Sequence, residues 1–148
     1  MFKVVVGYPS LEQEVVMLDR FQSHGGKVDL DRVTDVLDAS GVAQAQEAVR
    51  AIRADAPVLR YAAEIIGATR SHPALTLGAS PRATIALVQG AKAVAAMSGR
   101  DFATPDDVKS VVAPALRHRI LLTPEREIEG VRAEDVLRRI VEEVEVPR

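Results

Sequence analysis

With 148 residues, of which 47% are hydrophobic, the chain is long enough for one ordinary globular domain and too short for two. Its 19 basic and 21 acidic side chains nearly balance, so charge gives no reason to expect nucleic acid or an anionic membrane as a partner. The absence of cysteine excludes disulfides, thiolate metal sites and cysteine nucleophiles, and it suits the reducing cytoplasm, where we expect this protein to lie.

The N-terminus and the hydropathy pattern give no sign of targeting or of membrane insertion. No apolar run approaches the roughly 18 to 20 residues of a membrane span. The first residues also lack the charged, apolar and small-residue regions of a signal peptide. We therefore predict a soluble, unprocessed chain with no membrane partner.

The composition favours a mainly α fold, with one β-strand at the N-terminus. Aromatic residues make up only 3%, and a chain rich in Ala, Val and Leu is typical of closely packed helices. The exception is the β-branched run at residues 2–6, closed by Gly7, Tyr8 and Pro9, which predicts a strand running into a turn. Because one strand cannot satisfy its own backbone, we expect it to be disordered or to pair through its exposed edge.

The first predicted helix begins at a capping box. Ser10 and Gln13 have the S-x-x-Q spacing in which each side chain bonds the backbone N–H of the other residue. Apolar residues follow at helical spacing, which predicts a helix over residues 11–22. Gly25 and Gly26 end this helix, and the polar stretch up to residue 38 has no assigned structure.

The remaining helices are predicted from apolar residues at helical spacing and from their caps. They cover residues 42–52 behind Ser40, residues 55–70, residues 81–98 behind Ser80, a stretch from residue 105 behind Thr104, and residues 133–144. Pro114 is expected to bend or end the helix that starts at residue 105. Residues 71–79 carry Pro and Gly without a sustained period and predict a loop, and residues 123–130 predict a loose connection.

The helix at residues 81–98 is the most informative, because Arg82 and Lys92 are its only charged residues. Such a helix must be buried on more than one side. Its bulky face gathers Ile85, Leu87, Val88, Ala91, Val94 and Ala95. The opposite face is small and nearly smooth, with Arg82, Ala86, Gln89 and Ala93.

Arg82 is electrostatically misplaced in the first turn of this helix, because the positive end of the helix dipole disfavours a cation. An anion nearby would resolve the conflict. Free backbone N–H groups at the helix start, a preceding Gly78 that permits close approach, and a guanidinium that grips phosphate oxygens together describe an anion site. The same spacing also fits an Arg82 that pairs with a carboxylate or lies exposed, so the residues alone leave both interpretations open.

Other candidate groups have structural explanations. The three histidines, His24, His72 and His118, are isolated from one another and from carboxylates at helical spacing, so we predict no metal site. Asp106 and Asp107 sit in the first turn behind Thr104, where capping explains them better than paired-acid chemistry. The basic run at residues 117–119 suits a helix end, where cations meet the negative pole of the dipole.

Five strings in this order resemble the C-terminal part of MoxR-family AAA+ ATPases, and the likeness covers nearly the whole chain. They are VVGYPS at residues 5–10, ATRSHP at 68–73, LGASPRA at 77–83, GRDFATPDDV at 99–108 and LRHR at 116–119. The GASPRA string is the most specific of these, because in that family it holds the sensor-2 arginine of the helical lid.

The resemblance implies a role for particular residues. Arg82 would be the sensor-2 arginine, which reaches the γ-phosphate of bound ATP, with Gly78 and Ala79 beside it in the nucleotide site. Tyr8 and Pro9 would lie at the hinge near the adenine. Residues 1–9 would then be the last strand of the ATPase core with its hinge, and residues 10–148 the lid domain.

The sequence lacks the other parts of an ATPase. It contains no G-x-x-x-x-G-K-[ST] phosphate loop, no acidic Walker B strand to hold Mg²⁺, and no segment for sensor 1 or an arginine finger. We expect this chain to be a piece of a longer protein, to bind ATP and Mg²⁺ weakly by itself, and to be inactive alone.

For the intact protein, the resemblance implies a hexameric, chaperone-like remodelling ring. ATP and Mg²⁺ would be held between the core and the lid, neighbouring subunits would complete the ring, and a von Willebrand factor A-domain protein would be the partner. Two alternatives from other classes remain. One is a self-contained helical protein-interaction module without nucleotide, and the other is a helical nucleic-acid-binding domain, which the balanced charge disfavours.

Overall fold

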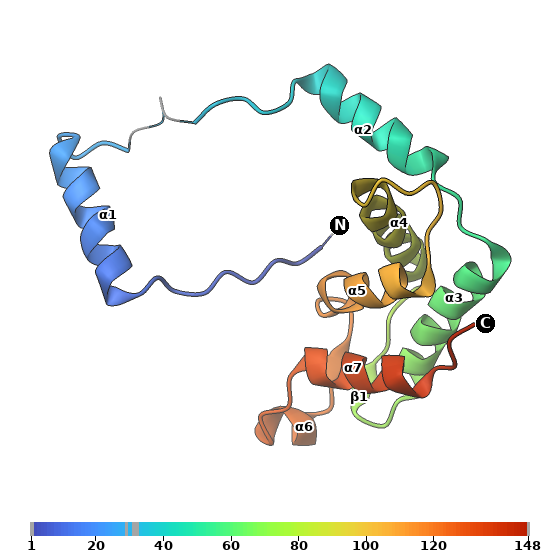
Figure 1. Cartoon of the computed structure of the whole chain (residues 1–148). Helices are drawn as coiled ribbons and strands as arrows, with labels where there is room; N and C mark the ends of the chain where they lie inside the picture. The colour runs from blue at the N-terminus through green and yellow to red at the C-terminus, as the bar shows by residue number, and fades with distance from the viewer. Residues whose placement is uncertain (1, 29, 31–32, 148) are drawn as a thin grey trace. The chain divides into compact units, whose positions relative to one another are not determined.

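The computed structural model describes residues 2–28, 30 and 33–147 of the chain. It divides into two compact units. One unit comprises residues 5–43, and the other comprises residues 1–4 together with residues 44–148. Helices make up most of the regular structure in both units (Figure 1). Within the described part of the chain, no helix is long and apolar enough to cross a membrane.

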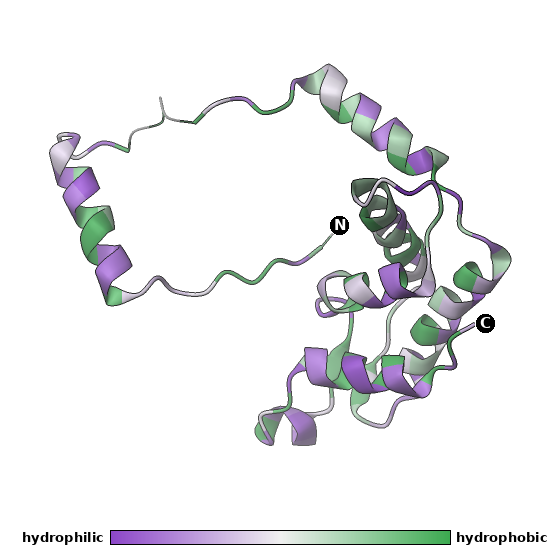
Figure 2. Ribbon diagram, in the orientation of Figure 1, coloured by the Kyte–Doolittle hydropathy of each residue, from purple (hydrophilic) through white to green (hydrophobic). Residues whose placement is uncertain are grey.

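The smaller unit contains helix α1 (Leu11–Ser23), which confirms the predicted capping box. The Ser10 hydroxyl accepts a hydrogen bond from the Gln13 backbone N–H at 3.3 Å, and the Gln13 side chain accepts one from the Ser10 N–H at 2.9 Å. Groups of hydrophilic and of hydrophobic residues follow one another along this helix (Figure 2), and none of its residues is buried. The chain leaves the helix through Gly25 and Gly26, both at positive φ, as glycine allows.

Helix α2 (Ala39–Ala51) begins earlier than predicted, and Ser40 is not its cap. The Asp38 carboxylate accepts hydrogen bonds from the Gly41 backbone N–H at 2.7 Å and from the Ser40 hydroxyl at 3.1 Å. A carboxylate near the positive end of the helix is better matched to the dipole than a neutral hydroxyl, which explains the difference.

The larger unit is built on four helices around one hydrophobic core. They are α3 (Ala56–Ser71), α4 (Pro81–Met97), α5 (Pro105–Leu116) and α7 (Ala133–Glu143). Helix α4 packs most extensively against α5, while α3 and α7 contact each other and both touch α5. Pro114 does not end α5, which continues beyond it to Leu116.

The buried side of α4 is narrower and smaller than predicted. It consists of Ala83, Leu87, Gly90, Ala91 and Ala95. Ile85 was expected in the core but is 61% exposed, because the buried arc is centred on Leu87 and Ala91 and Ile85 lies outside it. Most residues of this buried arc are small, and α4 packs most extensively against α5.

Two predicted loops contain regular structure. Residues 71–79 include strand β1 (Leu75–Leu77), which pairs antiparallel with β2 (Leu121–Leu122). The Thr76 hydroxyl reinforces the pair by donating to the Leu122 carbonyl at 3.1 Å. The predicted loose connection at residues 123–130 holds the short helix α6 (Pro124–Ile128).

The predicted N-terminal strand is not formed, since the described residues before Leu11 lie outside helices and strands. The Lys3 backbone N–H instead donates to the Pro114 carbonyl at 2.9 Å, at the end of α5. The Phe2 ring packs over Gly90, where a Cβ would lie 2.7 Å from its Cζ atom. A strand requires a row of partner groups, and among the residues that the structure describes this segment donates to one backbone carbonyl.

Candidate functional site

The candidate site lies at the start of α4. Ser80 is the N-cap residue and Pro81 the first helical residue, as predicted. The Ser80 side chain makes no capping hydrogen bond, whereas the capping residues of α1 and α5 both belong to complete capping boxes. The beginning of α4 is therefore not held by its own cap.

Arg82 follows Pro81 in the first turn and its side chain is exposed. Within residues 2–28, 30 and 33–147, neither its guanidinium nor its backbone N–H has a hydrogen-bond or ion-pair partner. A cation next to the positive end of a helix dipole, with no carboxylate to compensate, is suited to accept an external anion. Pairing of Arg82 with a carboxylate does not occur among the described residues, and the exposed guanidinium fits both remaining interpretations, an anion site and a solvated arginine.

Gly78 serves close packing rather than an open space beside Arg82. A Cβ on Gly78 would lie 2.6 Å from the Thr69 carbonyl oxygen and 2.6 Å from the Arg70 Cα. These are backbone atoms at the end of α3, which cannot move aside. The close approach predicted at Gly78 is thus an approach to the end of α3, and the place of Gly78 in a nucleotide site stays a prediction.

Ala79 is also engaged with α3 through both of its backbone polar groups. Its N–H donates to the Thr69 hydroxyl at 2.9 Å, and its carbonyl accepts from Arg70 Nε at 3.0 Å. Ala79 is 1% exposed and Thr69 is fully buried. Both backbone polar groups of Ala79 are thus used within the lid, and its contact with a nucleotide stays a prediction.

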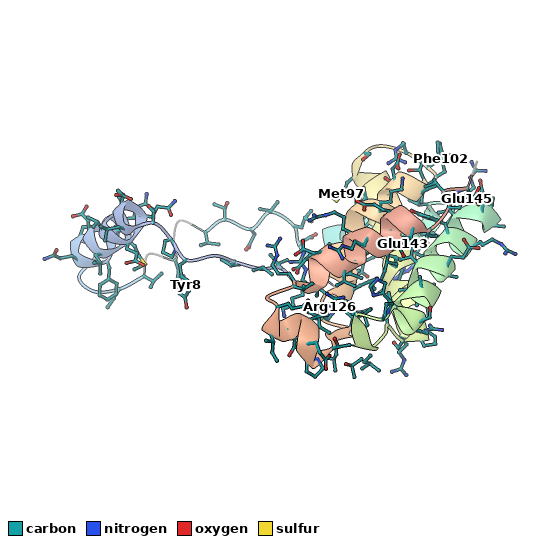
Figure 3. All side chains as sticks on the ribbon, turned by 90° about the horizontal axis from the view of Figure 1, so that it is seen from below. Tyr8, Met97, Phe102, Arg126, Glu143 and Glu145 are labelled. Carbon is teal, nitrogen blue, oxygen red and sulfur yellow. The ribbon has the colours of Figure 1, made fainter. Side chains whose placement is uncertain are left out.

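Tyr8 and Pro9, predicted at the adenine hinge, belong to the smaller unit. Tyr8 projects from the segment before α1 (Figure 3) and is fully exposed. Pro9 lines an open groove along α1 that also contains the apolar side chains of Val16, Met17 and Phe21. Their role at the hinge stays a prediction.

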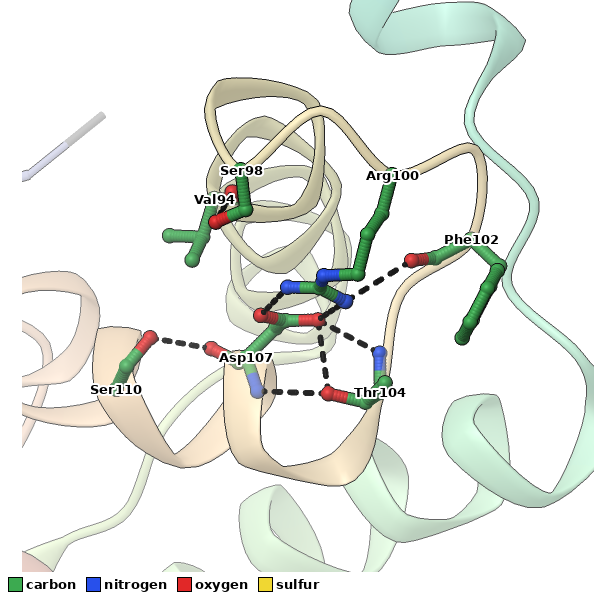
Figure 4. A network of polar contacts seen from close by, with 7 residues as sticks. All are labelled: Val94, Ser98, Arg100, Phe102, Thr104, Asp107 and Ser110. Atoms are coloured by element: carbon green, nitrogen blue, oxygen red, sulfur yellow. Dashed lines mark hydrogen bonds and ion pairs between the residues drawn. The ribbon is translucent and has the colours of Figure 1, made fainter.

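Asp107, at the start of α5, is held by a network of polar contacts (Figure 4). Arg100 donates to both carboxylate oxygens, at 2.6 and 2.8 Å. The Thr104 backbone N–H and hydroxyl also donate to Asp107, at 2.7 and 2.9 Å, which confirms the predicted capping role. Asp106 is exposed and pairs with Lys109 at 3.0 Å. Asp107 therefore holds the helix start through its capping box, and Asp106 makes a surface ion pair.

These contacts lower the pKa of Asp107 from 3.8 to about 2, chiefly through the Arg100 hydrogen bonds and against the opposing effect of burial. A carboxyl whose folded pKa lies below its unfolded value stabilises the fold above the unfolded value. That stabilisation is lost as the pH falls from about 4 through about 2.

We expect this acid sensitivity to depend on the Asp107 carboxylate. Lowering the pKa of Asp107 from 3.8 to about 2 corresponds to about 2 kcal/mol of stabilisation at neutral pH. Urea unfolding of the wild type and of Asp107→Asn, measured between pH 2 and pH 6, should give a difference in unfolding free energy that shrinks below about pH 4. A difference in unfolding free energy that stays constant over this pH range would show that protonation of Asp107 does not affect the stability of the fold.

The basic run at residues 117–119 has the structural role predicted for a helix end. Arg117 Nε donates to the Ala113 carbonyl at 3.1 Å, and its guanidinium pairs with Glu134 of α7 at 3.1 Å. Burial and the nearby charges of Arg119 and Lys3 lower the pKa of His118. No group of three metal-ligating side chains occurs in the part of the chain that the structure describes.

Sequence reasoning missed three residues that shape this region. Arg100 was not recognised as the partner of Asp107, and neither Thr69 nor Arg70 was connected to the start of α4. The one available indication was the position of Thr69 on the apolar side of α3, in line with Ile65 and Ile66, where a buried hydroxyl needs a partner.

A family model described as the AAA lid domain matches residues 67–140, which is half of the chain. The match includes Thr69, Arg70, Gly78, Arg82 and the Arg100–Asp107 pair. The candidate site therefore lies within the part of the chain that matches the family model.

Similar proteins include "Uncharacterized protein YeaC" of Bacillus subtilis, 36% identical over 99% of this chain and 45% of that protein. "Chaperone MoxR1" of Mycobacterium tuberculosis is 29% identical over 100% of this chain and 40% of that protein. The crystal structure of a "putative ATPase" from Cytophaga hutchinsonii superimposes with a TM-score of 0.82 at 26% identity, covering all of this chain and 47% of that one. The chain thus spans less than half the length of these relatives.

Proposed function

Because this chain belongs to the AAA lid domain family and is homologous to MoxR-family proteins, we propose that it closes over ATP and supplies a sensor-2 arginine. The observation that carries this proposal is Arg82: an exposed guanidinium in the first turn of α4, without a partner among the described residues. In this role Arg82 binds an oxygen of the γ-phosphate and stabilises the charge that develops there during hydrolysis.

The residues present fit one part of a nucleotide site. A planar guanidinium at a helix N-terminus matches a phosphate in charge and in hydrogen-bonding geometry. Phosphate oxygens and Mg²⁺ need further ligands, and the sequence contains no phosphate loop to supply them. The ATPase core of the intact protein would therefore hold most of the nucleotide and the Mg²⁺, and the lid would add Arg82.

Helix α1 is consistent with a lid that packs against further protein. Its apolar side chains Val15, Leu18 and Phe21 are each about half exposed or more. We propose that the ATPase core or a neighbouring subunit covers them in a cytoplasmic ring, which the resemblance indicates is a hexamer. The relative called a chaperone supports a remodelling role, and a von Willebrand factor A-domain protein is the partner we propose on the resemblance alone.

The division of labour between core and lid is tested by comparing the intact protein with this chain alone. Phosphate release from ATP should be measurable for the intact protein and absent for the purified 148-residue chain, because the groups that hold Mg²⁺ and orient water lie outside it. Gel filtration with fraction-by-fraction assay controls for contaminants. Turnover that co-elutes with the isolated chain would overturn the proposal, as would an intact protein that does not bind ATP.

A further inference from the structure

We propose that Thr69 is a positioning residue for Arg82, holding through Ala79 the backbone from which α4 starts. The inference rests on the proposed function of Arg82. It gives a buried threonine of α3 a part in the nucleotide response of the lid. Thr69 plays this part without touching the nucleotide itself.

The Thr69 hydroxyl uses its hydrogen-bonding capacity in two directions. It donates to the Ile66 carbonyl of its own helix at 2.6 Å, and it accepts from the Ala79 N–H at 2.9 Å. Because a hydroxyl has one proton, the bond within α3 fixes its orientation and leaves its lone pairs for the loop. Thr69 is fully buried and Ala79 is 1% exposed, so water does not compete for either bond.

Two further contacts make the same connection rigid. Arg70 Nε donates to the Ala79 carbonyl at 3.0 Å, so both polar groups of Ala79 are bound to neighbouring residues of α3. The Gly78 backbone lies directly against α3, where a Cβ would meet the Thr69 carbonyl oxygen at 2.6 Å. The contacts of Gly78 and Ala79 therefore fix the position of this loop against the end of α3.

Little conformational freedom remains between Ala79 and Arg82. Only Ser80 and Pro81 separate Ala79 from Arg82, and the pyrrolidine ring of Pro81 fixes its own φ. The Ser80 hydroxyl makes no cap bond that would set the helix start independently. The position of the Arg82 backbone, and with it the direction of the Arg82 side chain, is thus determined by contacts with α3. Loss of the Thr69 hydroxyl removes one of these contacts and lets the start of α4 shift.

The test uses the intact ATPase with Thr69→Val, which keeps the shape of the side chain and removes the hydroxyl. Misplacing a catalytic group by about 1 Å costs up to about a hundredfold in rate. We therefore expect turnover per folded molecule to fall on the order of tenfold to a hundredfold. Thr69→Ser should restore it, and the matched control Thr76→Val, which removes a hydroxyl bonded to the Leu122 carbonyl, should leave it within about twofold.

A double-mutant cycle with Arg82→Ala separates positioning from general damage. If Thr69 acts through Arg82, Thr69→Val lowers turnover in the wild-type background and has no further effect when Arg82 is already alanine. Should Thr69→Val fail to fold, Arg70→Ala replaces it in the cycle, because this exposed side chain supports the same Ala79 carbonyl without opening the core.

Each result decides the inference. Equal losses of turnover in both backgrounds would show that Thr69 only stabilises the fold, and an unchanged rate for folded Thr69→Val would show that it positions nothing. An Arg82→Ala variant with wild-type turnover would overturn the proposed function and this inference together. A strong effect of Arg82→Ala with none from Thr69→Val would remove only the positioning role.

Discussion

Replacing Arg82 with alanine in the intact ATPase is expected to lower turnover about a hundredfold to a thousandfold, the usual effect of removing one preorganised donor from a developing charge. The stability of the lid should hardly change. Arg82 is exposed and makes no ion pair within the described residues, and substitutions of that kind stay within about 0.5 kcal/mol. Steady-state ATP hydrolysis and thermal unfolding of the same preparations measure both effects.

Arg139 provides the matched control for this variant. It is also an exposed arginine on a helix, and in the described part of the chain it has no ion-pair partner. Arg139→Ala should leave both turnover and stability unchanged. The opposite pattern for Arg82→Ala, with an unfolded lid and an unaltered rate per folded molecule, would contradict the sensor role and make Arg82 a structural residue.

Asp107→Ala is expected to destabilise the larger unit by about 3 kcal/mol. The change removes two hydrogen bonds to Arg100 and two to Thr104, and it leaves Arg100 without its carboxylate. The Arg100 side chain is 32% exposed, so water can reach it and the loss should stay near the lower end for a broken buried pair. For a unit of this size the midpoint of thermal unfolding should fall by more than about 10 °C.

The neighbouring acid is the control for that loss. The Asp106 side chain is 88% exposed and, among the described residues, pairs with Lys109 alone, so Asp106→Ala should cost less than about 1 kcal/mol. Urea unfolding of both variants at neutral pH compares them directly. Similar losses for the two substitutions would mean that Asp107 contributes only a first-turn charge and that the Arg100 pair is not a major support of α5.

The parts of the fold that local sequence determines were predicted well. The capping boxes at Ser10 and Thr104 depend on residues three positions apart, and both form as expected. The β1–β2 pair joins Leu75 to Leu122, far apart in sequence, and no local pattern reveals such a pairing. Ile85 was misplaced because it was grouped with Leu87, although two residues at about 100° each put the two side chains on nearly opposite faces of the helix.

The candidate site likewise has parts that the sequence predicts and parts that only the folded chain brings together. An arginine in a first helical turn is visible in the sequence, and the structure places Arg82 there with an exposed side chain. A glycine in the loop before this helix indicates close approach but not what approaches, and at Gly78 the neighbour is the backbone of α3. The Arg100–Asp107 pair depends on the turn through Gly99, which has a positive φ, so its two halves meet only in the folded chain.

The most direct test of the sensor role is the structure of the intact ATPase with a non-hydrolysable ATP analogue in the closed state. A guanidinium nitrogen of Arg82 should lie about 2.7 to 2.9 Å from an oxygen of the γ-phosphate, the distance of a charge-assisted hydrogen bond. A closed complex in which other residues contact every γ-phosphate oxygen, while Arg82 points into solvent or pairs with a carboxylate, would contradict the account.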